Sequence, residues 1–178
     1  TDYLVVESTY GDRLHPADQV PDQLARVVLE TVERGGTLVV PAFAVGRAQH
    51  LLHLLDELRA AGRIPDLPIF LDSPMAIDAT ELFHVHRADH RLSNTQCATM
   101  CRPARYTHTP DESKQIDRGE GPMIVISASG MATGGRVLHH LRRFLPDKNS
   151  TVLLVGYQAA GTRGRSLIDG ADELKLLG

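Results

Sequence analysis

Short apolar runs alternate with longer amphipathic segments along most of this chain. Runs rich in Val, Leu and Ile predict buried strands over residues 3–6, 37–40, 69–71, 123–127 and 151–155. Weaker patterns predict a strand near Tyr106 and a terminal strand over residues 174–177. Continuously apolar strands of this length are typical of a sheet that is covered on both faces.

Between these runs, apolar residues recur every three or four positions and predict helices. The expected helices cover residues 17–34, 46–61, 74–92, 135–145 and 165–168. Glycines after the first two helices and the Asp72-Ser73-Pro74 start of the third are typical helix boundaries. Residues 93–108 show no clear period. Strands that alternate with helices indicate parallel βαβ units, so the sequence predicts a three-layer α/β sandwich with a mainly parallel, Rossmann-like sheet.

At 178 residues and 19.5 kDa, the chain is large enough for one domain of ordinary size, and we expect residues 1–178 to form it. No apolar run approaches the roughly 18 residues of a membrane-spanning helix, so we expect no membrane partner. Only two cysteines are present, which excludes a disulfide framework and favours a cytoplasmic location. No signal peptide is recognisable, and both ends lie in apolar segments, so we expect a domain excised from a longer protein.

The net charge of −3 is unevenly distributed. The first 81 residues hold 6 Lys and Arg against 13 Asp and Glu, whereas the remaining residues hold 13 against 9. This asymmetry is compatible with a local anion-binding face on a mildly acidic chain. Charge alone therefore leaves nucleic-acid binding open.

Polar and glycine-rich loops follow the predicted strands, where ligands of parallel sheets collect. These loops cover residues 7–13, 41–47, 72–75, 127–136 and 156–165. The fourth has three glycines and two serines between a strand and a helix, so its backbone N–H groups could approach a phosphate. It has neither the Walker lysine nor G-x-G-x-x-G spacing, and a glycine turn needed only for close packing is an equal alternative. Arg163 and Arg165 in the fifth loop favour an anion.

Two charged residues have both a functional and a structural interpretation. Glu7 could orient a histidine or transfer a proton, or it could hydrogen-bond the backbone of Ser8 or Thr9. Arg47, at a helix start, opposes the helix dipole, so a ligand phosphate or a carboxylate should hold it. The candidate carboxylates are Asp72 and Glu7.

We predict no metal site in this chain. His84, His86 and His90 form an H-x-H-x-x-x-H string, but on one helix only the last two share a face. Cys97 and Cys101 lack a second pair, and neither serine of the fourth loop lies in a G-x-S-x-G elbow. Because aromatic residues make up only 4% of the chain, backbone contacts to a nucleic acid are favoured over base reading.

Taken in order, the loop sequences resemble the β-CASP domain of metallo-β-lactamase-fold RNA-processing nucleases. The strings that carry the resemblance are E-S-T-Y-G-D-R (7–13), P-A-F-A-V-G-R-A-Q (41–49), L-D-S-P-M (71–75), S-G-M-A-T-G-G-R (129–136) with H-H-L (139–141), and V-G-Y-Q (155–158) with G-T (161–162). They extend over essentially the whole chain. Each string by itself is a weak match, but five strings in this order are specific for the family.

The resemblance implies an RNA-binding cap of a zinc-dependent ribonuclease, in which two zinc ions generate a hydroxide that attacks a phosphodiester. It implies that Glu7 has a catalytic role, supporting a histidine of the active centre, and that the loop over residues 127–136 binds RNA phosphates. The expected substrate-binding residues are Ser8, Thr9, Tyr10, Phe43, Arg47, Asp72, Ser73, Ser127, Ser129, Gly130, Gly134, Gly135, Arg136 and Arg163. The expected partners are RNA, the metallo-β-lactamase domain of the same parent chain and, as one option, a second copy in a homodimer.

The chain also departs from the family pattern. The family's H-x-H-x-D-H zinc motif is absent, and its two later histidine motifs would lie past Gly178. We therefore expect the isolated chain to need no cofactor, to bind no catalytic zinc and to cleave nothing, the two zinc ions being expected in the parent enzyme. Two other classes stay open, a stand-alone nucleotide- or phosphometabolite-binding α/β domain and a structural module that associates through an apolar surface.

Overall fold

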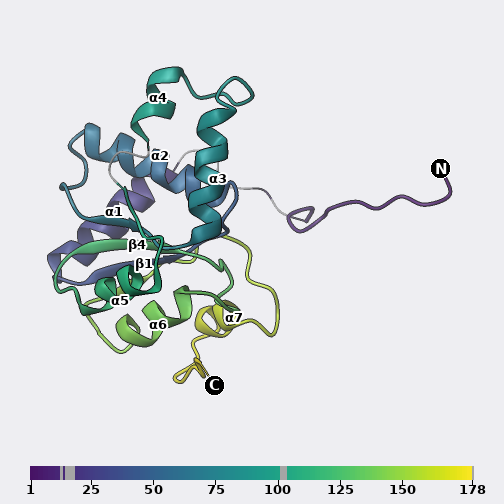
Figure 1. Ribbon diagram of the computed structural model, residues 1–178. Helices are drawn as coiled ribbons and strands as arrows, with labels where there is room; N and C mark the ends of the chain where they lie inside the picture. The colour runs from purple at the N-terminus through teal and green to yellow at the C-terminus, as the bar shows by residue number, and fades with distance from the viewer. Residues whose placement is uncertain (13, 15–18, 101–103, 178) are drawn as a thin grey trace.

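Figure 1 shows a computed structural model of the chain, which describes residues 1–12, 14, 19–100 and 104–177. Five parallel strands form one sheet in the order β3-β2-β4-β1-β5. Their bounds are β1 Thr37–Pro41, β2 Ile69–Leu71, β3 Ala104–Tyr106, β4 Met123–Ser127 and β5 Thr151–Val152. Pro41 pairs with Ser127 and Leu71 with Ile126, so the three central strands end along one edge of the sheet.

Helices cover both faces of this sheet, as Figure 1 shows. The helices of the described residues are α1 Val20–Glu33, α2 Arg47–Ala60, α3 Pro74–Val85, α4 Asn94–Thr99, α5 Pro110–Arg118, α6 Val137–Phe144 and α7 Arg163–Ile168. α1, α2 and α3 pack on one face, and α5 and α6 pack on the other. The predicted three-layer α/β sandwich is confirmed. No helix in the described part of the chain is long and apolar enough to cross a membrane.

Alternation along the strands divides the core between the two faces. Leu38 and Val40 of β1 and Ile124 of β4 pack under α1, α2 and α3. Val39 and Val125, one position along, pack under α5 and α6 instead. Because successive strand side chains point to opposite faces, a strand buried on both sides must be apolar throughout. This is why the continuous apolar runs predicted the central strands correctly.

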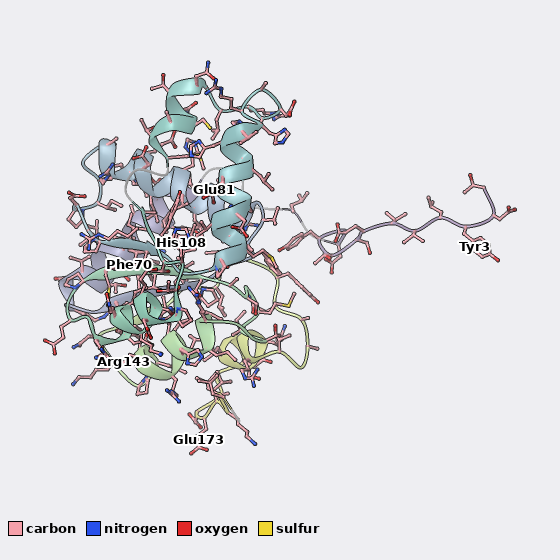
Figure 2. The ribbon with its side chains drawn as sticks, viewed as in Figure 1. Tyr3, Phe70, Glu81, His108, Arg143 and Glu173 are labelled. Carbon is pink, nitrogen blue, oxygen red and sulfur yellow. The ribbon has the colours of Figure 1, made fainter. Side chains whose placement is uncertain are left out.

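Three predicted strand segments differ from the structure. Residues 3–6 form no strand, and their side chains are exposed, with Tyr3 90% and Val5 96% accessible. Figure 2 shows Tyr3 on a segment that leads away from the body of the molecule. Residues 174–177 also form no strand, and β5 ends at Val152 rather than residue 155. An apolar run becomes a strand only when a neighbouring strand pairs with it, and sequence pattern carries no information on that partner.

Two helices arise where apolar periodicity predicted none. The first residues of α4 follow a capping box in which Ser93 accepts from the Gln96 N–H, and α5 follows the same motif built from Thr109 and Glu112. α5 places Ile116 as its one buried apolar residue, so the cap and not the apolar pattern marks it in the sequence. α3 ends at Val85, earlier than the expected residue 92, so the predicted helix was too long.

Candidate functional site

The loops that follow β1, β2 and β4 meet at one edge of the sheet. Because β2, β4 and β1 are neighbours in that order, the segments after Leu71, Ser127 and Pro41 lie next to one another. Ser127 Oγ donates to the backbone oxygen of Asp72 at 2.7 Å, which joins two of these loops directly. The structure therefore brings together three of the five loops that the sequence singled out.

Asp72, the residue after β2, is completely buried and accepts four side-chain hydrogen bonds. Thr107 Oγ1 and Ser113 Oγ each donate at 2.5 Å, Arg136 Nη1 at 2.7 Å and His140 Nε2 at 2.6 Å. Burial by itself raises the pKa of the Asp72 carboxyl, but these donors outweigh it and hold the pKa well below its usual range. Asp72 is therefore an ionised, fully satisfied anion at the centre of the site.

His140 lies between two carboxylates. Its Nε2 faces Asp72, and its Nδ1 is 2.7 Å from Asp117 Oδ1. Burial lowers the pKa of this imidazole, but the hydrogen bonds and charges of Asp117 and Asp72 outweigh burial, so the pKa is raised. Two ring nitrogens that both face carboxylates fit the imidazolium, which donates from both. With Arg136, the two cations balance the two aspartates, so the cluster is neutral as a whole.

Arg136 is the second cation of this cluster. Its Nη1 also donates to the Thr107 backbone oxygen at 3.0 Å, and its Nη2 donates to the His108 backbone oxygen at 2.9 Å. The side chain is 19% exposed. The guanidinium thus ties the start of α6 to the segment between β3 and α5. Its predicted contact with RNA phosphate stays a prediction, and the structure gives it a positioning role.

The glycine-rich loop between β4 and α6 is held open by its own hydrogen bonds. Ser129 Oγ accepts from the Thr133 N–H at 3.0 Å. Gly135 has φ +82°, and a Cβ there would lie 2.6 Å from the Ala128 backbone oxygen, so this turn requires glycine. In the described part of the chain, the N–H groups of residues 130, 131, 134 and 135 take no hydrogen-bond partner. These donors lie directly before α6.

A pocket of about 500 Å³ opens beside this loop, and we call it the loop pocket. The residues that line it are Phe43, Ala44, Asp72, Ser73, Pro74, Met75, Ala128, Ser129, Gly130, Gly134, Gly135 and Arg136. Phe43 is 41% exposed, and its ring packs so closely on Gly130 that a Cβ there would lie 2.9 Å from the ring. The pocket therefore combines backbone donors with an exposed aromatic face.

Two residues of the fifth loop fix the glycine-rich loop from behind. Gln158, which the sequence did not single out as a site residue, is buried and its Nε2 donates to the Gly130 backbone oxygen at 2.9 Å. Arg163 Nη1 donates to the Thr133 backbone oxygen at 3.2 Å, and its Nε donates to that of Lys175 at 2.7 Å. Arg163 is thus engaged with backbone, and its predicted contact with RNA stays a prediction.

The first loop contacts the fifth loop through Tyr10. The Tyr157 N–H donates to Tyr10 Oη at 2.9 Å, and the two rings meet edge to face at 6.3 Å. Glu7 is exposed, and its Oε1 accepts from the Thr9 N–H at 2.7 Å. Hydrogen bonds with Thr9, first from its side chain and then from its backbone, lower the pKa of the Glu7 carboxyl. The hydrogen bond from the Thr9 N–H is the structural role that the sequence analysis gave as the alternative to catalysis. The catalytic role of Glu7 stays a prediction, as does RNA binding by Ser8, Thr9 and Tyr10.

Several predicted RNA-binding residues are not at the surface. Ser127 and Ser73 are buried, at 1% and 5% exposure, and Asp72 is fully enclosed. Ser73 caps α3 by accepting from the Ala76 N–H, as the sequence predicted. These three residues position the loops in this structure, and their direct contact with RNA stays a prediction.

Arg47 begins α2 and makes no ion pair in the described part of the chain. Both carboxylates that were candidates to hold it are engaged elsewhere, Asp72 with His140 and Glu7 with Thr9. Neither carboxylate forms an ion pair with Arg47 in this structure, and the binding of a ligand phosphate by Arg47 stays a prediction.

The three histidines of the H-x-H-x-x-x-H string do not lie on one helix, contrary to the expectation from the sequence. Because α3 ends at Val85, His90 is not on the helix, and His84 Nδ1 and His90 Nε2 lie 3.3 and 3.8 Å from Cys97 Sγ. His86 instead faces Asp89 at the surface. Cys101 lies outside the described residues. Within the described ranges, no three or more His, Cys, Asp or Glu side chains form a group that could hold a metal ion.

Comparison with known proteins gives a consistent set of relatives. The model of the Beta-Casp domain family matches residues 48–167. Ribonuclease TTHA0252 of Thermus thermophilus is 36% identical over 185 residues, which cover 99% of this chain and 42% of that protein. An RNase J-like protein of Methanocaldococcus jannaschii is 36% identical, over 98% of this chain and 41% of its own length. The transcription termination factor FttA of the same organism is 34% identical, over 98% and 29% respectively. The chain thus spans less than half of the length of these relatives.

Proposed function

The chain belongs to the Beta-Casp domain family, and on that premise we propose that it is the RNA-binding part of a zinc-dependent ribonuclease. One of the relatives above is named a ribonuclease and another an RNase J-like protein, and the chain spans about two fifths of each. In this proposal the chain binds and orients the RNA strand. The cleavage chemistry belongs to residues outside it, in the metallo-β-lactamase domain of the parent.

The observation that carries the proposal is the glycine-rich loop with its unpartnered N–H groups. Backbone donors that converge before a helix form a site for a phosphate, because the helix dipole and the N–H groups act together. The exposed ring of Phe43 lies in the same pocket and offers a surface on which a base stacks. A phosphate next to a base is the repeating unit of a single-stranded nucleic acid.

The Asp72 cluster supports this site by fixing the two sides of the loop pocket relative to each other. Arg136 and His140, at the start of α6 and within it, are both bound to Asp72, which follows β2. The glycine-rich loop on one side of the loop pocket and residues 72–75 on the other are therefore held at a fixed separation. Preorganised donors lose little entropy when the ligand binds.

The two zinc ions expected for the parent enzyme do not fit the residues described here, which contain no group of metal ligands. No step of the proposal runs through a metal bound to this chain. We retain, from the resemblance alone, that Glu7 orients a histidine of the parent's active centre.

Two variants at Gly134 test phosphate binding at the loop. A Cβ at this position meets no atom within 4 Å, so Gly134→Glu and Gly134→Gln introduce side chains of equal size and different charge. At roughly 8 Å and an effective dielectric constant of about 20, a carboxylate repels a phosphate by about 2 kcal/mol, or about 30-fold in Kd. Fluorescence anisotropy of a labelled single-stranded RNA with this chain measures both values. Equal Kd values for the Glu and Gln variants would contradict the proposal.

A further inference from the structure

A second cavity, of about 580 Å³, lies at the β5 edge of the sheet and shares no lining residue with the loop pocket. It lies between α1, α2, α7 and the segment over residues 153–158, and we call it the edge pocket. Leu24, Leu51 and Leu54 form its apolar floor, together with Leu153 and Val155 at the edge of the sheet. Its volume is within the range of about 300–1,000 Å³ that is typical of small-molecule sites.

The charges around the edge pocket are all of one sign. Arg26, Arg47 and Arg165 line it together with the imidazole of His50, and the described lining contains no Asp or Glu. This is unexpected in a chain of net charge −3 whose first 81 residues are its acidic part. Arg165 is paired with Asp169 outside the pocket, whereas Arg26 and Arg47 make no ion pair within the described residues. Two guanidinium groups that line one pocket without a carboxylate indicate a site for an anion.

The mouth of the pocket is aromatic. Tyr157 is 39% exposed, and its orientation is fixed by the edge-to-face contact with Tyr10 and by the hydrogen bond from its backbone N–H to Tyr10 Oη. An aromatic ring above an apolar floor suits a flat, partly apolar group such as a nucleobase. Burial, and then the charge of Arg47, lower the pKa of His50, so at pH 7 its imidazole is a neutral hydrogen-bonding group.

We propose that the edge pocket binds one nucleoside monophosphate unit, with the phosphate held by Arg26 and Arg47 and the base placed between Tyr157 and the leucine floor. This site is distinct from the one that carries the proposed function and does not depend on it. The unit is either a nucleotide of an RNA strand or a free mononucleotide. Phe43 separates the two pockets, since its ring contacts both Gly130 of the loop pocket and Gly156 of the edge pocket.

Isothermal titration of the chain with AMP tests the site, with adenosine and inorganic phosphate as the two halves of the ligand. We expect saturable binding of AMP and binding at least about tenfold weaker for either half, because each occupies only part of the pocket. Arg47→Ala and Arg26→Ala should each weaken AMP binding by about tenfold or more, the usual effect of one lost hydrogen bond to a charged group. Arg142→Ala, an exposed arginine of α6 on the opposite face, is the matched control and should leave the Kd unchanged.

Competition with single-stranded RNA separates the two sources of the ligand. Displacement of AMP by RNA would identify a nucleotide of the strand, and binding of RNA without displacement would identify a free mononucleotide; both results support the site. Gly134→Glu should not change the Kd for AMP. A result that contradicts phosphate binding at the loop pocket is therefore distinguishable from one that contradicts AMP binding at the edge pocket. The proposal is overturned if AMP does not saturate the chain by about 10 mM, or if both arginine variants bind AMP as the wild type does while their thermal unfolding is unchanged.

Discussion

Replacing Asp72 with Asn changes the charge of the buried cluster while keeping the shape of the side chain. Each carboxylate oxygen now accepts from two donors, Oδ1 from Thr107 and Arg136 and Oδ2 from Ser113 and His140. An asparagine has one oxygen and one NH2 group, so in either orientation its NH2 group faces one hydroxyl, which can rotate to accept, and one cation at 2.6 or 2.7 Å, which only donates. The variant therefore leaves one cation without its Asp72 partner and places it against a second donor.

The expected loss of stability follows from these contacts. Hydrogen bonds to charged groups contribute about 1.5–3 kcal/mol each, and the one from the facing cation is lost in either orientation. Removing one partner from a buried ion pair costs about 3–5 kcal/mol, because the remaining charge is uncompensated. We expect the free energy of unfolding to fall by about 3–5 kcal/mol, a large fraction of the roughly 5–15 kcal/mol that stabilises a domain.

Urea unfolding followed by circular dichroism measures this change from the midpoint and the slope. Asp66→Asn is the control, because Asp66 is 85% exposed and 3.5 Å from Arg59, so its loss should change the free energy of unfolding by less than about 0.5 kcal/mol. If Asp72→Asn unfolds within about 1 kcal/mol of the wild type with an unchanged slope, the buried cluster does not stabilise the fold and the reasoning is refuted.

Three further predictions concern protons, backbone and metal. Because the pKa of His140 is raised from 6.5, the folded state binds this proton more tightly, and the urea midpoint should fall as pH rises above 6.5 through that raised pKa. Because the pKa of Asp72 is lowered from 3.8, the urea midpoint should also fall as pH decreases below 3.8. A urea midpoint that does not change with pH would contradict both predictions. Gly135→Ala places a Cβ 2.6 Å from a backbone oxygen at φ +82° and should cost at least about 1–3 kcal/mol, whereas Gly134→Ala meets no atom within 4 Å and should unfold at nearly the wild-type midpoint. Metal analysis of the purified chain should find no pair of tightly bound zinc ions, and the chain should not cleave RNA; metal-dependent cleavage would refute this.

The layers of the fold were predictable because burial on both faces leaves a local signal. β1 and β4 are unbroken apolar runs, and the stripe of leucines in α2 has the helical period. The same signal failed at residues 3–6, which are equally apolar but have no paired neighbour in the described structure. The apolar pattern also missed α5, because the sequence signal for the start of this helix is the Thr109-Pro-Asp-Glu112 capping box and not its apolar residues.

The Asp72 cluster could not be predicted from local patterns, because its members are distant in sequence. Asp72 and His140 are separated by 68 positions and meet only because β2 and α6 approach the same edge of the sheet. One signal was nevertheless present. His140 shares a helical face with Val137, Leu141 and Phe144, all buried, and a histidine in an apolar stripe requires a buried partner. The local sequence does not indicate which carboxylate is the partner of His140.

Variants in the Asp72 cluster and in the loop pocket should change the salt dependence of RNA binding differently, which allows the roles of the two to be separated. Asp72 is fully buried, so we expect Asp72→Asn to weaken RNA binding by loosening the loop while the number of phosphate contacts stays the same. The dependence of log Kd on log salt should then keep its slope. Gly134→Glu acts on the phosphate itself, so its slope should fall by about 0.7 for each phosphate contact that is lost. A reduced slope for Asp72→Asn would instead mean that the cluster fixes the donors themselves, and that positioning and binding in this chain are one property.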